Sequence, residues 1–243
     1  NRIMNNHDFF PALNVKFNLN DKHSIRFAAS RTITRPLFVE MAPFLYQESY
    51  GSAQIRGNEN LQNGYNYNVD LKYEYFLNDN MFSATAYFKF LDNPIERVQE
   101  LQGGATMHSF RNATHGLAAG VEVEGKVSIT DWCRIAANVS YMYTDVKLPF
   151  AGAYTNKERQ LQGASPILAN ADVTFCPRIA QDRRINISIL YNLQGSRIHA
   201  VGVSGLGDVI QMPLHTLNLN MIASVSNHFD VRLKLDNILN SAD

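Results

Sequence analysis

Apolar and polar residues alternate with a period of two along most of this chain. From Tyr65 to Tyr75, every odd position is apolar or aromatic, whereas every even position is polar or charged. The side chains of a β-strand point alternately to its two faces, so this segment predicts a strand with one apolar and one polar face. On a helix, the same residues would be scattered around the axis.

The alternation recurs in further segments, which together predict about ten strands. They cover residues 13–19, 25–29, 65–75, 82–90, 117–124, 133–144, 167–175, 185–193, 217–225 and 229–236. Many of these strands are longer than the roughly 5–6 residues usual in soluble proteins. A strand that crosses a bilayer needs about 9–11 residues. No segment predicts a helix.

The connections between these strands alternate between short and long. Short turns are predicted at residues 18–23, 78–80, 130–132, 177–183 and 226–228, and long loops at 32–64, 92–115, 147–165 and 196–213. Outer-membrane barrels have short periplasmic turns and long extracellular loops. Aromatic residues also gather near the strand ends, as in the two girdles of a membrane barrel. The predicted fold is all-β, an antiparallel transmembrane β-barrel.

The composition agrees with this interpretation and narrows the possible partners. Charged residues make up 18% of the 243 residues, below the roughly 25% usual for soluble domains. No run of about 20 apolar residues predicts a membrane helix, and barrel strands escape such a search because they alternate. The formal net charge of +0 argues against a nucleic acid as partner. The polar faces carry charges of both signs, and so polar an interior favours a barrel larger than the ten strands alone.

The cysteines and glycines indicate no special chemistry. Cys133 and Cys176 lie near predicted short turns but on opposite faces of their strands, so we expect free thiols. His, Cys, Asp and Glu residues do not cluster at the spacing of metal ligands. The glycines at positions 202, 205 and 207 are not followed by a helix, as a nucleotide-binding loop requires. We therefore expect neither a metal site nor a cofactor.

Short motifs along nearly the whole chain resemble those of TonB-dependent outer-membrane receptors, especially the large receptors of gut-type Bacteroidetes. Residues 30–44 resemble S-R-x-x-x-R-P…E-x-A-P, residues 57–71 resemble G-N-x-x-L…N-x-D-L, residues 88–96 resemble F-Y-K…P-I-E, residues 112–124 resemble N-x-x…G-V-E-x-E, residues 159–166 resemble R-x-L-x-G-x-S-P, and residues 235–240 resemble V-x-N-L-F/L-N. Each motif is short, so the resemblance depends on the order and spacing that the whole set of motifs shares with the family.

The resemblance implies a barrel of about 22 strands, filled by an N-terminal plug and driven by the inner-membrane TonB complex. Residues 1–243 would then form a single partial barrel domain, with the plug domain, the early strands and the last strand absent. The implied partners are outer-membrane lipid, the TonB complex through the missing plug segment, a small solute and a surface lipoprotein. The implied function is uptake of a scarce solute, which could be an iron chelate, heme, cobalamin or an oligosaccharide.

Six residues of the long loops are of kinds that stack on sugars or bind anionic chelates, and we predict them as candidates for the solute-binding site. They are Tyr46, Tyr50, Arg56, Tyr154, Arg197 and His199. Alternative interpretations are an outer-membrane porin, a barrel enzyme or a soluble β-sandwich binding module. No G-x-S-x-G nucleophile motif is present, so we predict no catalytic residue and do not expect an enzyme.

Overall fold

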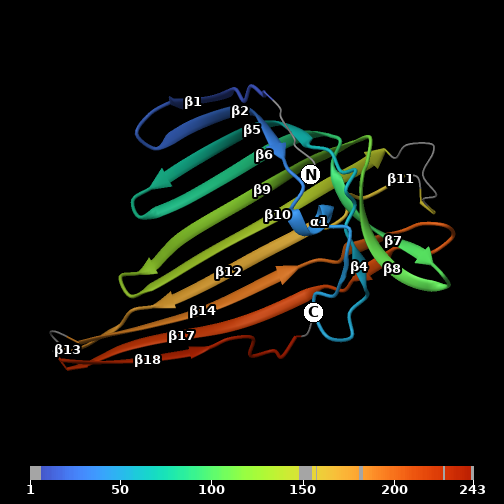
Figure 1. Ribbon diagram of the computed structural model, residues 1–243. Coiled ribbons are helices and arrows are strands. Elements are labelled where there is room, and N and C mark those ends of the chain that lie inside the picture. Colours follow the sequence, from blue (N-terminus) through green and yellow to red (C-terminus); the bar gives the residue numbers. More distant parts are fainter. Residues whose placement is uncertain (1–6, 148–154, 157, 181–182, 227, 242–243) are drawn as a thin grey trace.

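Ten long strands form one antiparallel sheet in which neighbours in the chain are neighbours in space (Figure 1). This computed structural model describes residues 7–147, 155–156, 158–180, 183–226 and 228–241. The strands are β1 (Ala12–Asn18), β2 (His23–Thr34), β5 (Gly64–Leu77), β6 (Asn80–Asp92), β9 (His115–Thr130), β10 (Cys133–Lys147), β12 (Ile167–Phe175), β14 (Arg183–Gln194), β17 (Leu214–Ser226) and β18 (Phe229–Leu235). Short strands β11 (Glu158–Arg159) and β13 (Arg178–Ala180) pair with β10 and β14. All ten predicted strands are confirmed.

The long sheet exposes its apolar face and partly covers its polar face. On β5, the side chains of Tyr67, Val69 and Leu71 are 44%, 42% and 52% exposed. The polar residues Glu74 and Ser83, on the other face, are only 6% and 5% exposed. A soluble sandwich buries its apolar face in a core, whereas a membrane barrel turns that face toward lipid. The arrangement therefore fits a bilayer as the surrounding solvent.

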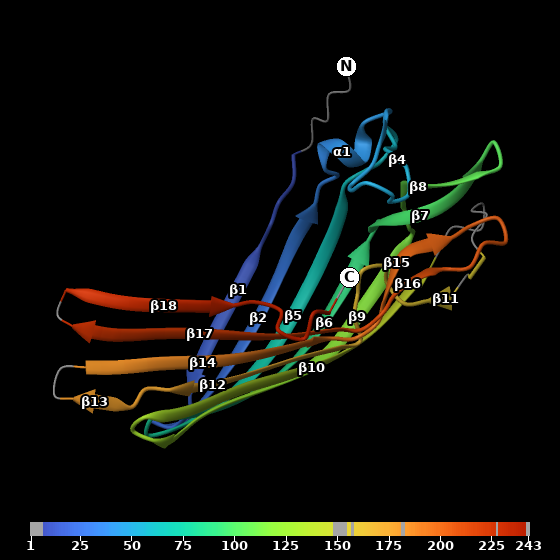
Figure 2. The ribbon, with the colours of Figure 1, turned by 90° about the horizontal axis from the view of Figure 1, so that it is seen from below.

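The sheet is strongly curved, and its two ends differ (Figures 1 and 2). In the described part of the chain, the short turns lie at one end of the sheet and the long connections at the other, as the sequence predicts. The two-residue turn between β5 and β6 holds Asn78 at a φ of 51°, a left-handed conformation that asparagine tolerates better than most residues. Within the described chain, β1 and β18 each pair with one strand only, so the sheet is open.

The segments that the sequence predicts as long loops contain strands of their own. They contain a second, six-stranded sheet in the order β16 (Val209–Gln211), β15 (Arg197–Gly202), β7 (Ile95–Gln102), β8 (Ala105–Asn112), β4 (Ile55–Arg56) and β3 (Leu45–Tyr46). We call this second sheet the cap sheet. The sequence does not predict these strands because they show little alternation, and because two of their pairings join segments that are far apart in the chain.

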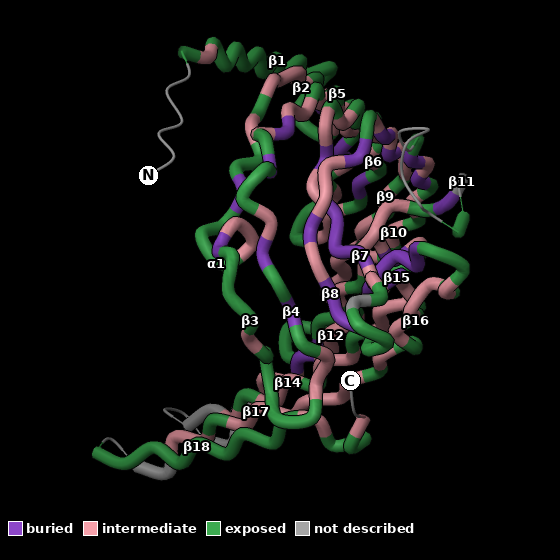
Figure 3. Tube along the Cα trace, turned by 45° about the vertical axis from the view of Figure 1, so that its right-hand side comes forward, coloured by how far each residue is buried: buried purple, intermediate pink, exposed green. Residues whose placement is uncertain are grey.

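A single helical turn, α1 (Phe38–Met41), precedes β3, although no helix is predicted from the sequence. In the described part of the chain, no helix has the length and apolar character needed to cross a membrane. Figure 3 shows that the deeply buried positions gather in the cap sheet and beside α1. Two small apolar clusters hold this region together. One consists of Val98, Ile198, Val201 and Val203, and the other of Ile55, Leu61 and Phe110.

The two cysteines remain free thiols, as predicted. Cys133 begins β10 and is buried, and its register partner is Phe175 on β12. Cys176 follows the last residue of β12 directly and is half-buried.

Tyr87 is the one aromatic residue at an inward position of β6, and Gly120 of β9 makes room for it. The two residues are direct register partners. A Cβ atom added at Gly120 would lie 2.5 Å from Cζ of Tyr87 and 2.5 Å from the carbonyl oxygen of Tyr141. A side chain at position 120 would therefore displace both the ring and the neighbouring strand.

We predict that Gly120→Ala destabilises the barrel by about 1–3 kcal/mol, the usual cost of forcing atoms into a packed site. Gly125→Ala, on the same strand, is the matched control, because its Cβ would lie 3.5 Å from the nearest atom. The measurement is the temperature at which the full-length protein in detergent loses the gel mobility of the folded barrel. Equal transition temperatures for the two variants would contradict this role of Gly120.

Candidate functional site

A continuous row of polar side chains crosses the concave face of the long sheet. Each residue is the direct register partner of the next one, on eight successive strands. The row is Ser24, Glu74, Ser83, Glu124, Asn138, Asn170, Asn192 and Thr216. Because strands of alternating polarity pair without a shift of register here, polar positions from distant segments come together on one face.

The first part of this row, on β2 to β9, is held by ion pairs. Glu74 accepts a hydrogen bond from Arg26 Nε at 2.7 Å and another from Ser24 Oγ at 2.9 Å. Lys72 Nζ lies 3.8 Å from Glu74 and 3.7 Å from Glu124, so it bridges two carboxylates. Burial of Glu74 is tolerated because opposite charges and a hydroxyl group surround it.

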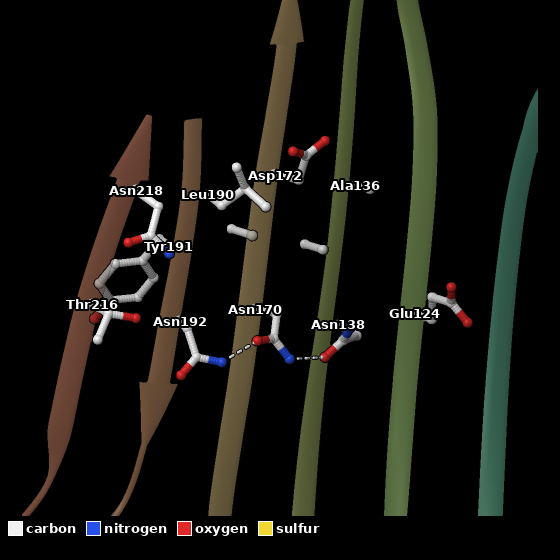
Figure 4. A pocket seen from close by; sticks show the side chains of 12 residues that line it. Glu124, Ala136, Asn138, Asn170, Asp172, Leu190, Tyr191, Asn192, Thr216 and Asn218 are labelled. Atoms are coloured by element: carbon white, nitrogen blue, oxygen red, sulfur yellow. Dashed lines mark hydrogen bonds between the residues drawn. The ribbon is translucent and has the colours of Figure 1, made fainter. Parts of the chain in front are cut away.

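The second part, on β10 to β14, is a ladder of amides (Figure 4). Asn192 Nδ2 donates to Asn170 Oδ1, and Asn170 Nδ2 donates to Asn138 Oδ1 at 2.8 Å. The ladder lines a cavity of about 400 Å³, to which Glu124, Asp172, Asn218 and other residues contribute.

At the opposite end from the short turns, a buried ion pair ties the long connections together. Glu96 on β7 and Arg159 on β11 are 2% and 3% exposed, and their nearest charged atoms are 2.5 Å apart. Gln162 extends the link, because its backbone N–H donates to Glu96 at 3.3 Å and its side chain donates to the carbonyl oxygen of His199 at 2.9 Å. Three long connections are thereby joined in one folded unit.

A second charged group fixes the connection between β3 and β4. Arg97 donates to Glu48 at 3.0 Å and to His108 Nδ1 at 2.9 Å. Burial lowers the pKa of His108 to about 4, and the positive charges of Arg97 and His199 act in the same direction. Burial also raises the pKa of the Tyr46 phenol, with Glu48 adding to the effect. Through Arg97, these contacts link β7 to β8 and to the connection between β3 and β4.

The structure distributes the predicted binding residues over two edges of the cap sheet. Tyr46 on β3 packs against the Ile55 cluster, and Tyr50 is fully exposed in the following connection. Arg56 on β4 is exposed and lines a polar cavity of about 500 Å³. Tyr46 and Arg56 lie on paired strands.

On the other edge, Arg197 and His199 share β15. Arg197 donates to Gln211, and the ring of His199 lies 5.9 Å from that of His108. Tyr154 lies outside the described residues. The structure therefore brings the candidates together in pairs and not as one site. The amide ladder was not among the predicted sites, although each asparagine occupies a polar position of its alternating segment.

A model of the Outer membrane protein beta-barrel family matches residues 1–242. The chain belongs to this family. Its location is accordingly the outer membrane. No curated protein sequence matches the chain significantly.

Solved structures of siderophore receptors and of a copper transporter share the fold. The ferric enterobactin receptor PfeA of Pseudomonas aeruginosa matches with a TM-score of 0.65 and 17% identity over 95% of this chain and 35% of its own. The siderophore receptor PirA of Acinetobacter baumannii matches with a TM-score of 0.65 and 14% identity over 96% and 37%. The copper transporter OprC matches with a TM-score of 0.64 and 13% identity over 94% and 33%. The chain thus spans about a third of the length of these proteins.

We predict that Glu96→Gln loosens the cap sheet by about 3–5 kcal/mol, because it leaves the Arg159 guanidinium buried without its counter-charge. Glu100→Gln is the matched control, since its ion pair with Arg111 is partly exposed and worth less than about 1 kcal/mol. Hydrogen–deuterium exchange of β7 and β15 in the full-length protein measures the difference. Unchanged protection in the Glu96 variant would show that the ion pair does not hold the cap sheet.

We also predict that the cap sheet loosens as the pH falls from about 6.5 to 4. His108 has an ordinary pKa of 6.5 and a pKa of about 4 in the folded cap sheet, so the opened form binds the proton more readily. Its contribution is complete above pH 6.5 and is lost as the pH approaches 4. In His108→Gln, which still offers an oxygen to Arg97, exchange of β7 and β8 should lose this pH dependence. The same pH dependence in both proteins would assign it to other groups.

Proposed function

We propose that this chain forms part of the barrel of a TonB-dependent receptor that imports a scarce solute through the outer membrane. In this proposal it is the C-terminal part of the barrel, and the receptor is of the Bacteroidetes type. Two observations support the proposal. The fold likeness to solved siderophore receptors and a copper transporter extends over 94% to 96% of the chain, and the receptor-like motifs are spread over nearly its whole length.

The single observation that carries the proposal is the combination of an open, curved sheet with a folded cap at one end. An open edge cannot face lipid, because its backbone groups would have no hydrogen-bond partners, so further strands must complete the barrel. The polar concave face then lines an interior wide enough to need filling. A plug in that interior, coupled to the TonB complex, supplies the gating that the receptor requires.

In this function, the cap sheet forms the outer vestibule and the residues at its two edges contact the solute. Tyr46, Tyr50 and Arg56 serve one edge, and Arg197 and His199 serve the other; Tyr154 belongs to the same group of candidates. A surface lipoprotein is the proposed partner above the vestibule. The chain performs no covalent chemistry in this scheme.

The test is solute uptake by the native organism. Deleting the gene of the full-length protein should abolish uptake of one class of large solute, and inactivating TonB should abolish the same uptake while leaving small porin substrates unaffected. Complementation with the wild-type gene is the control. Uptake that depends on the gene but not on TonB would make the protein a porin, and unchanged uptake of every candidate solute would exclude import.

A further inference from the structure

The concave face divides into a charged part and an amide part. The inward positions of β5 and β9 carry Lys72, Glu74, Glu122 and Glu124 among others. The inward positions from β10 to β17 carry several amides beside apolar and hydroxyl residues and a few charged ones. The amides include Asn138, Asn170, Asn186, Asn192, Asn218 and Asn220. One side of the wall is thus suited to ion pairs and the other to hydrogen bonds between neutral groups.

The cavity on the amide part contains no basic side chain among its lining residues. It does contain two carboxylates, those of Glu124 and Asp172. Asp172 accepts a hydrogen bond from Thr174 Oγ1 at 3.0 Å and has no ion-pair partner in the described structure. Glu124 has Lys72 as a counter-charge 3.7 Å away, whereas Asp172 has none among the described residues, so an anionic solute that enters this cavity meets an unpaired carboxylate and no basic lining residue.

The ladder offers the cavity both donors and acceptors. Oδ1 of Asn192 and Nδ2 of Asn138 form no hydrogen bond within the described protein, and each bonded Nδ2 group keeps a second N–H. Figure 4 shows these amides side by side on neighbouring strands, with Thr216 and Asn218 flanking them. A hydroxyl group both donates and accepts, so a solute rich in hydroxyl groups can satisfy such a surface at several points.

We propose that this cavity binds an uncharged, hydroxyl-rich solute of the oligosaccharide class as it passes along the barrel wall. This assignment rests on the proposed import function. It favours an oligosaccharide over an anionic iron chelate, because no basic residue lines the cavity. The amides hold the solute by several exchangeable hydrogen bonds, and the two carboxylates accept hydrogen bonds from its hydroxyl groups.

The test is calorimetric binding to the purified full-length protein in detergent. The probes are neutral linear oligosaccharides of glucose, mannose and fructose, each tested separately, with an anionic ferric tris-catecholate for comparison. The wild type should bind a neutral oligosaccharide, and Asn170→Ala should weaken that binding about tenfold, as the loss of about 1.4 kcal/mol of hydrogen bonding does. Asn186→Ala is the matched control, because this residue lies inward on β14 but outside the cavity.

The outcomes separate the binding assignment from the import function. Binding of the ferric chelate alone, of no oligosaccharide, or of an oligosaccharide with equal strength by the Asn170 and wild-type proteins would each overturn the binding assignment. Loss of uptake on gene deletion would still stand in those cases. Gel mobility of the folded barrel verifies that each variant folds, and Asn192→Ala replaces Asn170→Ala if the latter does not.

Discussion

The lack of hydrogen-bond partners in the hydrocarbon interior of a bilayer is the constraint on which this structure depends. Every backbone N–H and C=O group at that depth must bond within the protein, which a sheet of long antiparallel strands achieves along its length. Lipid also accepts apolar side chains without cost, so the outward positions of β5, β6 and β10 carry Val, Leu, Ala and aromatic residues. The polar residues therefore occupy the concave face. There, charged side chains form ion pairs and amide side chains hydrogen-bond to one another.

The same period of two explains how a simple pattern builds a specific surface. Once the register between two strands is fixed, every polar position of one strand is fixed against those of its neighbour. The alignment of Glu124 with Asn138, and of Asn138 with Asn170, follows from the register alone. The charged part and the amide part of the concave face share the same kind of register. They differ only in which residues occupy the equivalent positions.

The ten strands could be predicted because each one carries its own signal in the chain. The cap sheet could not, because its strands contain few alternating residues and because two of its pairings are parallel and join distant segments. These pairings place Val201 beside Val98 and Ile55 beside His108. The buried ion pair of Glu96 and Arg159 could not be predicted either, because it joins two segments that the sequence analysis assigns to separate loops. Tyr46 and Arg56 were correctly placed in one connection, but their position on paired strands depends on that same unpredicted sheet.

The direct test of the membrane orientation is a nitroxide scan of consecutive positions along the middle of β10, in the full-length protein reconstituted into bilayers. Labels at Ile135, Ala137 and Val139 should show high accessibility to dissolved oxygen and low accessibility to a water-soluble nickel complex, and labels at Ala136 and Asn138 should show the opposite. This two-residue rhythm is the predicted result, because odd positions face lipid. If the odd positions were shielded from both reagents, they would lie in a protein core, and the barrel account would be wrong.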